Sequence, residues 1–274
     1  MTSNPPSQRR VRTLALAAAL GALLAACQVP VPVVPANETR DRITASDEPD
    51  AQRRARARME LASAYFGRGQ MTTALDQVKL AIAADPLYGD AFNLRGLIYA
   101  NLGDTGLAEE SFRRALQLNA RDADTMHNYG WYLCQQQRYA ESNAMFSQAL
   151  AVTQYRGTAR TLLAQGVCQA HAGQLVEAEA SLARAYELDP SSPFTATNLS
   201  EVLYRRGEFE RARFYVRRVN ALADVANAQT LWLAARIEMK LGNRQGATEF
   251  GARLRNRFPE SREASAFARG AFDE

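Results

Sequence analysis

Apolar residues of two sizes recur along the chain with a period of about 34 residues. Small residues fill the eighth, twentieth and twenty-seventh positions of most periods, and bulkier ones fill the eleventh and twenty-fourth. Glycines lie at 69, 103, 173, 207 and 242, and Gln137 stands where one more glycine would keep the spacing. The periods in register begin at Ala55, Gly89, Ala123, Ala159, Pro193 and Ala228.

Each period predicts a helical hairpin. Small residues let two helices approach closely, and bulky residues fill the space between them. One hairpin cannot bury its apolar face alone, so six are expected to stack. The pattern resembles the tetratricopeptide repeat, which implies an all-α, superhelical solenoid of six hairpins. The hairpins are predicted over residues 55–88, 89–122, 123–158, 159–192, 193–227 and 228–261 of a domain spanning 55–274.

The end of the domain departs from the pattern. In the last period Gly251 stands where a bulky residue is expected. The residues beyond it, Ser261 to Phe272, are too few for another hairpin. They are predicted to form a short C-terminal segment that caps the stack.

A different apolar pattern precedes the repeats. Thr13–Ala26 is an apolar run of 14 residues behind arginines at 9, 10 and 12, shorter than the roughly 20 residues that a membrane-spanning helix needs. This arrangement is typical of a secretory signal. Leu24-Ala25-Ala26-Cys27 closely resembles a bacterial lipoprotein motif, which implies removal of residues 1–26 and a covalent lipid on Cys27. The alternative is an ordinary secretory signal in which Cys27 is incidental.

The segment after Cys27 contains prolines at 30, 32, 35 and 49 and no helical periodicity. Because proline fixes φ and lacks an N–H donor, residues 27–54 are predicted to be a flexible, lipid-anchored tether. Gln28 is not the aspartate that retains many lipoproteins at the inner membrane. The predicted location is therefore the periplasmic face of the outer membrane of a Gram-negative bacterium.

Charge and motifs exclude several classes of function. The chain has 33 Lys and Arg against 29 Asp and Glu, but three arginines lie in the signal, which leaves 30 − 29 = +1. A nucleic-acid partner is therefore not supported. The two histidines, His127 and His171, form no metal-spaced pair, and no catalytic triad order or phosphate-binding glycine loop occurs. We expect no enzyme activity, no metal, no cofactor besides the lipid and no small-molecule substrate.

Two further cysteines, Cys134 and Cys168, lie 34 residues apart on the first helices of adjacent hairpins. These helices run side by side, and the predicted compartment is oxidising. A disulfide is therefore predicted. Two extra residues between Thr153 and Thr158 shift the two repeat positions against each other, so adjacency is not guaranteed. The alternative is two buried thiols that pack as small apolar groups.

Trp131 occupies the ninth position of its period, on the helix face that lines the concave groove in tetratricopeptide repeats. A tryptophan among amides suits recognition of an extended or helical peptide. The alternative is that Trp131 packs in the core and that the asparagines only suit the fold. Arginines 113, 114, 217 and 218 are expected to form a solvated face. The predicted protein-binding residues, here called the groove set, are Asn93, Asn101, His127, Asn128, Trp131, Gln135, Asn198, Glu201, Tyr204 and Arg205.

Three runs narrow the resemblance: MHNYGWYLCQQQRYAES (126–142), GVCQAHAGQ (166–174) and NLSEVLYRRGEFERARFYVRRVN (198–220). With the lipoprotein motif and six repeats, they are similar to the type IV pilus biogenesis and stability lipoproteins of the PilF/PilW family. This implies a non-enzymatic, pilotin-like scaffold that helps the pilus secretin localise and form multimers. One alternative is an assembly factor for another envelope machine, such as barrel insertion or polysaccharide export. Another is a soluble periplasmic co-chaperone.

Overall fold

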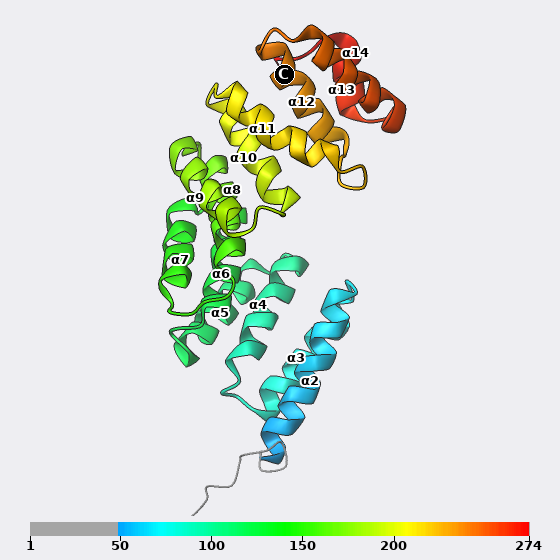
Figure 1. Ribbon diagram of the computed structural model, residues 1–274. Coiled ribbons are helices and arrows are strands. Elements are labelled where there is room, and N and C mark those ends of the chain that lie inside the picture. Colours follow the sequence, from blue (N-terminus) through cyan, green and yellow to red (C-terminus); the bar gives the residue numbers. More distant parts are fainter. Residues whose placement is uncertain (1–48, 274) are drawn as a thin grey trace, which may run out of the picture. The chain divides into compact units, whose positions relative to one another are not determined.

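The computed structural model describes residues 49–273, and in this part helices pair in sequence order into six hairpins followed by one short helix (Figure 1). Each hairpin packs against the next, as the solenoid prediction requires, and the all-α tetratricopeptide-type fold is confirmed. The helices are α2 (Asp50–Gly67), α3 (Met71–Ala84), α4 (Gly89–Leu102), α5 (Thr105–Leu118), α6 (Ala123–Gln135), α7 (Tyr139–Ala151), α8 (Thr158–His171), α9 (Leu175–Leu188), α10 (Pro193–Arg205), α11 (Phe209–Ala221), α12 (Ala228–Lys240), α13 (Arg244–Arg257) and α14 (Arg262–Arg269).

The predicted signal, the acylation of Cys27 and most of the predicted tether lie outside the described residues. Helix α2 begins at Asp50, five residues before the expected start of the domain. The last residues assigned to the tether, 50–54, are therefore helical. Pro49 stands just before the helix, where its missing N–H removes no hydrogen bond within the helix.

The small residues of the repeat let the two helices of a hairpin touch. A Cβ atom built on Gly96 of α4 would lie 2.7 Å from the ring of Phe112 in α5. In the next hairpin the Ser142 hydroxyl donates a hydrogen bond of 2.7 Å to the carbonyl of Gly130. Small residues thus permit both the ring-to-backbone contact and a short link between the helices.

The turns inside the hairpins need a left-handed backbone. Five of the predicted glycines, at 69, 103, 173, 207 and 242, have φ between +74° and +84°. Gln137, at the position where the sequence lacks a glycine, has φ of +60° and ends its helix in the same way. The turn therefore keeps its geometry although a side chain makes this conformation less favourable.

The C-terminal cap explains Gly251. The Ser261 hydroxyl accepts a hydrogen bond from the backbone N–H of Ala264 and so begins α14. Phe267 of α14 then packs edge-on to Trp232, with ring centroids 6.4 Å apart. A Cβ on Gly251 would lie 1.9 Å from the Phe267 ring. The bulky residue expected at this position thus comes from the cap.

Ion pairs join elements within and between hairpins. The Glu238 side chain is 1% exposed, and its Oε1 accepts hydrogen bonds of 2.9 and 2.6 Å from Arg217. Arg217, expected on a solvated face, is half exposed but holds this buried carboxylate. Glu109 accepts hydrogen bonds of 2.9 Å from both Arg138 and Tyr129, and the bond from Arg138 is the main cause of its lowered pKa.

Candidate functional site

Cys134 of α6 and Cys168 of α8 are joined by a disulfide, with their Cα atoms 5.8 Å apart. The bridge links the first helices of the third and fourth hairpins. Trp131 and Tyr139 pack against the apolar cluster that contains the bridge. Trp131 is therefore half-buried, because part of its side chain packs against the cluster that contains the disulfide.

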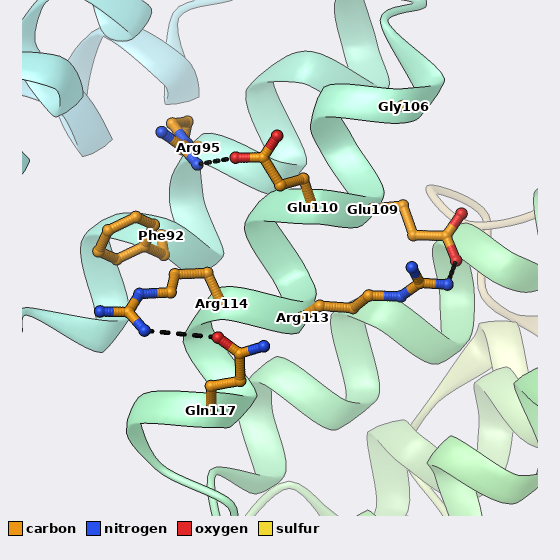
Figure 2. Close-up of a pocket in the computed structure, with 8 residues that line it drawn as sticks. All are labelled: Phe92, Arg95, Gly106, Glu109, Glu110, Arg113, Arg114 and Gln117. Carbon is orange, nitrogen blue, oxygen red and sulfur yellow. Dashed lines mark hydrogen bonds and ion pairs between the residues drawn. The ribbon is translucent and has the colours of Figure 1, made fainter.

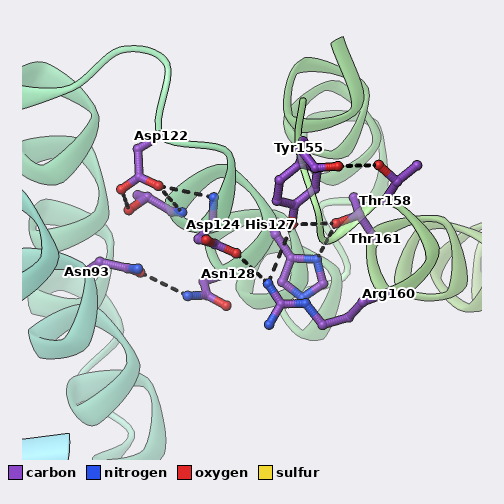
Figure 3. A network of polar contacts seen from close by, with 10 residues as sticks. Asn93, Asp122, Asp124, His127, Asn128, Tyr155, Thr158, Arg160 and Thr161 are labelled. Atoms are coloured by element: carbon purple, nitrogen blue, oxygen red, sulfur yellow. Dashed lines mark hydrogen bonds and ion pairs between the residues drawn. The ribbon is translucent and has the colours of Figure 1, made fainter. Parts of the chain in front are cut away.

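Polar side chains of the groove set connect neighbouring first helices (Figure 3). The amide of Asn128 on α6 donates a hydrogen bond of 3.1 Å to Asn93 Oδ1 on α4. His127 Nδ1 lies 2.9 Å from Thr161 Oγ1 on α8, and the Tyr155 hydroxyl lies 2.9 Å from the same oxygen. These contacts hold α4, α6 and α8 in fixed register.

Exposure divides the groove set into three groups. His127 and Tyr204 are buried, at 8% and 9% exposed. Residues that contact a partner are expected to be more exposed than this. The reason is packing: His127 is held between α6 and α8, and the Arg236 guanidinium covers Tyr204, 4.5 Å from its ring centroid. Asn101, Gln135 and Arg205 are exposed, and Asn93, Asn128, Trp131, Asn198 and Glu201 are half-buried.

Burial lowers the pKa of His127 to about 4, and the charge of Arg160 adds to this effect. In the unfolded chain the pKa of this histidine is near 6.5, so as the pH falls the unfolded chain binds the proton before the folded chain does. The stability that comes from keeping His127 neutral is therefore fully present above about pH 6.5 and is lost as the pH drops toward 4.

We expect the wild type to lose about 2 kcal/mol more than the variant His127→Gln between pH 8 and pH 5, from the two pKa values. Thermal or urea unfolding at both pH values measures the difference. The control is His171→Gln, which makes the same replacement at an exposed histidine. Equal pH dependence of the wild type and His127→Gln would contradict the burial argument.

Two members of the groove set, Asn198 and Glu201, line a cavity of about 300 Å³ between α10, α12 and α14. Burial is the main cause that raises the pKa of Glu201. Arg205 lies outside the lining and donates a hydrogen bond of 3.0 Å to the carbonyl of Ala170. The full lining is Thr197, Asn198, Glu201, Gln229, Trp232, Leu233, Arg236 and Glu263.

Sequence reasoning missed the residues that the last hairpin and the cap add to this cavity. Arg236 occupies the ninth position of its period, the same position as Trp131 and Glu201. Listing the residue at the ninth position of every period would have included Arg236 among the candidate groove residues. No comparable signal marks Glu263, because it comes from the cap, which has no place in the repeat.

A wider pocket of about 560 Å³ lies on α4 and α5 (Figure 2). Figure 2 shows the guanidinium groups of Arg95 and Arg114 beside Phe92, and their carbons are 4.9 and 5.8 Å from its ring centroid. Arg113 points away from this ring toward Glu109, with which it pairs at 2.5 Å. The arginines of this pocket thus have partners within their own hairpin.

Residues 49–273 hold no group of three or more His, Cys, Asp or Glu side chains placed to bind a metal ion. Within the same range, none of the helices combines the length and the apolar character needed to cross a bilayer.

Comparison with known proteins identifies relatives. The tetratricopeptide repeat model matches residues 59–123 and 130–193. The type IV pilus assembly protein PilF of Pseudomonas aeruginosa is 26% identical over 211 residues, which cover 77% of this chain and 83% of PilF.

Two solved structures agree with that match. The crystal structure of PilW, described as a widely conserved type IV pilus biogenesis factor, superposes with a TM-score of 0.73 at 32% identity and covers 78% of this chain and 98% of PilW. The structure of Pseudomonas aeruginosa PilF gives a TM-score of 0.72 at 25% identity and covers 81% of this chain and 100% of that protein.

Proposed function

The chain belongs to the PilF/PilW family of tetratricopeptide-repeat proteins, and from this premise we propose that it is a non-enzymatic outer-membrane lipoprotein of type IV pilus biogenesis. In this proposal it binds the pilus secretin, promotes its localisation and multimerisation, and takes no small-molecule substrate. The observation that supports this most is the match to PilW at 32% identity over 98% of that chain. The half-buried and exposed members of the groove set are the proposed contact residues.

The binding claim is tested by affinity purification. The full chain, tagged at its C-terminus, is isolated from detergent-solubilised outer membranes, and the recovered secretin is quantified by immunoblot. The proposal expects secretin in amounts that a tagged, unrelated lipoprotein does not retain. Recovery equal to that control would overturn the proposed partner.

The proposed anchor is Cys27, followed by a tether that ends near the start of α2 at Asp50. Several acyl chains together anchor a protein stably, at about 0.8 kcal/mol per buried methylene. An anchor also raises the local concentration of the scaffold beside a membrane partner.

We expect the variant Cys27→Ala to leave the outer-membrane fraction and to take up no labelled fatty acid, while its repeats stay folded. The matched control is Gln28→Ala, which keeps the thiol and should fractionate as the wild type does. Membrane fractionation and fatty-acid labelling measure both variants. A Cys27→Ala protein that stays in the outer membrane would contradict the anchor.

A further inference from the structure

The lining of the cavity between α10, α12 and α14 contains two carboxylates. Glu201 of α10 and Glu263 of α14 contribute carboxylates from different elements. Asn198 donates its amide N–H to the carbonyl of Phe194 at 2.8 Å, which leaves its Oδ1 as an acceptor. Two glutamates and one asparagine thus line the same cavity of about 300 Å³.

Within residues 49–273, neither Glu201 nor Glu263 has a hydrogen bond or an ion pair. Burial is the main cause that raises the pKa of Glu201, the nearby charges of Arg236 and Arg205 oppose it, and no side chain in this range donates a hydrogen bond to this half-buried carboxylate. Buried or half-buried carboxylates normally have such donors. The cavity therefore holds acceptor capacity that the chain itself leaves unused.

The one cation in the lining is already engaged. Arg236 Nε donates a hydrogen bond of 3.2 Å to the carbonyl of Phe272, and its guanidinium lies over the ring of Tyr204. With Glu201 and Glu263 negative and Arg236 positive, the lining has a formal charge of −1. A ligand with one positive charge and several donors complements this site.

We propose that the cavity takes an arginine side chain from an extended segment of the partner protein. A guanidinium has five N–H donors in a fixed fork, which suits two carboxylates and an amide oxygen, and its single charge neutralises the lining. A lysine has three donors on a point charge and matches fewer of these acceptors. This inference rests on the proposed function, since it names the chemistry by which the scaffold binds its partner.

The first test titrates the full chain with N-acetyl-arginine amide and follows the fluorescence of Trp232, in a Trp131→Phe background so that one tryptophan remains. We expect saturable binding. The uncharged isostere N-acetyl-citrulline amide should bind about tenfold more weakly, as loss of a charge-assisted hydrogen bond predicts. Equal binding of the two compounds, or no binding of either, would overturn the inference.

Two variants remove one carboxylate each from different helices, Glu201→Gln and Glu263→Gln. Each should weaken the arginine compound by about tenfold. The control Glu260→Gln makes the same charge change at an exposed position outside the lining and should bind as the wild type does. Wild-type affinity in both test variants, with circular dichroism unchanged, would overturn the inference.

The last test separates this inference from the proposed function. Secretin multimers are measured in cells that lack the chain and in cells that make only the double variant Glu201→Gln, Glu263→Gln. If deletion removes the multimers and the double variant restores them fully, the arginine site is wrong and the scaffold function stands. If deletion changes nothing, the scaffold function is wrong, and the titration alone decides whether the cavity binds arginine. Multimers lost in both strains support both.

Discussion

Replacing Cys134 with serine lowers the free energy of unfolding by about 3 kcal/mol, because a bridge that closes a loop of 34 residues restricts the unfolded chain. Each hairpin contacts mainly its neighbours, so the loss should be local. Backbone amides of α6, α7 and α8 should exchange hydrogen faster, and those of α2 and α13 should not. Trp131 should become more mobile, since its cluster loses the bridge.

Segment 49–274, exported to the periplasm, is the material for this measurement because it contains only two cysteines, Cys134 and Cys168. Dithiothreitol should lower the unfolding midpoint of the wild type to that of Cys134→Ser and leave the variant unchanged. Thiol counting in the denatured, unreduced wild type should give zero. Two free thiols there, or a variant as stable as the wild type, would contradict the bridge.

Replacing Gly251 with leucine, the bulky residue that the repeat favours, displaces the C-terminal cap. The new Cβ would lie 1.9 Å from the Phe267 ring, and that ring is packed against Trp232 and Phe272. Overpacking of this kind costs about 1–3 kcal/mol, and loss of the aromatic contacts adds to it. We expect a lower unfolding midpoint and red-shifted fluorescence from Trp232.

The matched control is Gly106→Leu on α5, where a Cβ meets nothing within 4 Å. It should be neutral or stabilising, because leucine favours a helix over glycine. Adding Phe267→Ala to Gly251→Leu should restore part of the lost stability by making room for the leucine. A Gly251→Leu variant as stable as the wild type would show that the cap does not depend on this contact.

The repeat itself could be predicted from the sequence because its physical requirements are local and periodic. Gly96 must be small since Phe112 lies against it, and the same contact recurs one period later at Gly130. Gln137 was placed in a glycine position by spacing alone, and its backbone has the left-handed φ that the position requires. Such features depend on residues within one hairpin.

Most features that depend on contacts between hairpins could not be predicted in this way, whereas the Cys134–Cys168 bridge could, because its two cysteines lie one period apart. Arg217 was expected on a solvated face, yet it pairs with the buried Glu238 of the next hairpin. The burial of His127 depends on Thr161, 34 residues away. Glu263 reaches the cavity only because Gly251 admits Phe267 and so seats the cap. These pairings follow from how the hairpins stack, which period and composition do not specify.

The measurement that tests the scaffold function most directly is the amount of multimeric secretin in outer membranes of a strain that lacks this chain. Detergent-resistant multimers are separated from monomers by electrophoresis and quantified by immunoblot, and surface pili are counted in the same cells. We expect multimers and pili to be lost and to return when the wild-type chain is supplied in trans. Normal multimers and normal pili in the deletion strain would contradict the account.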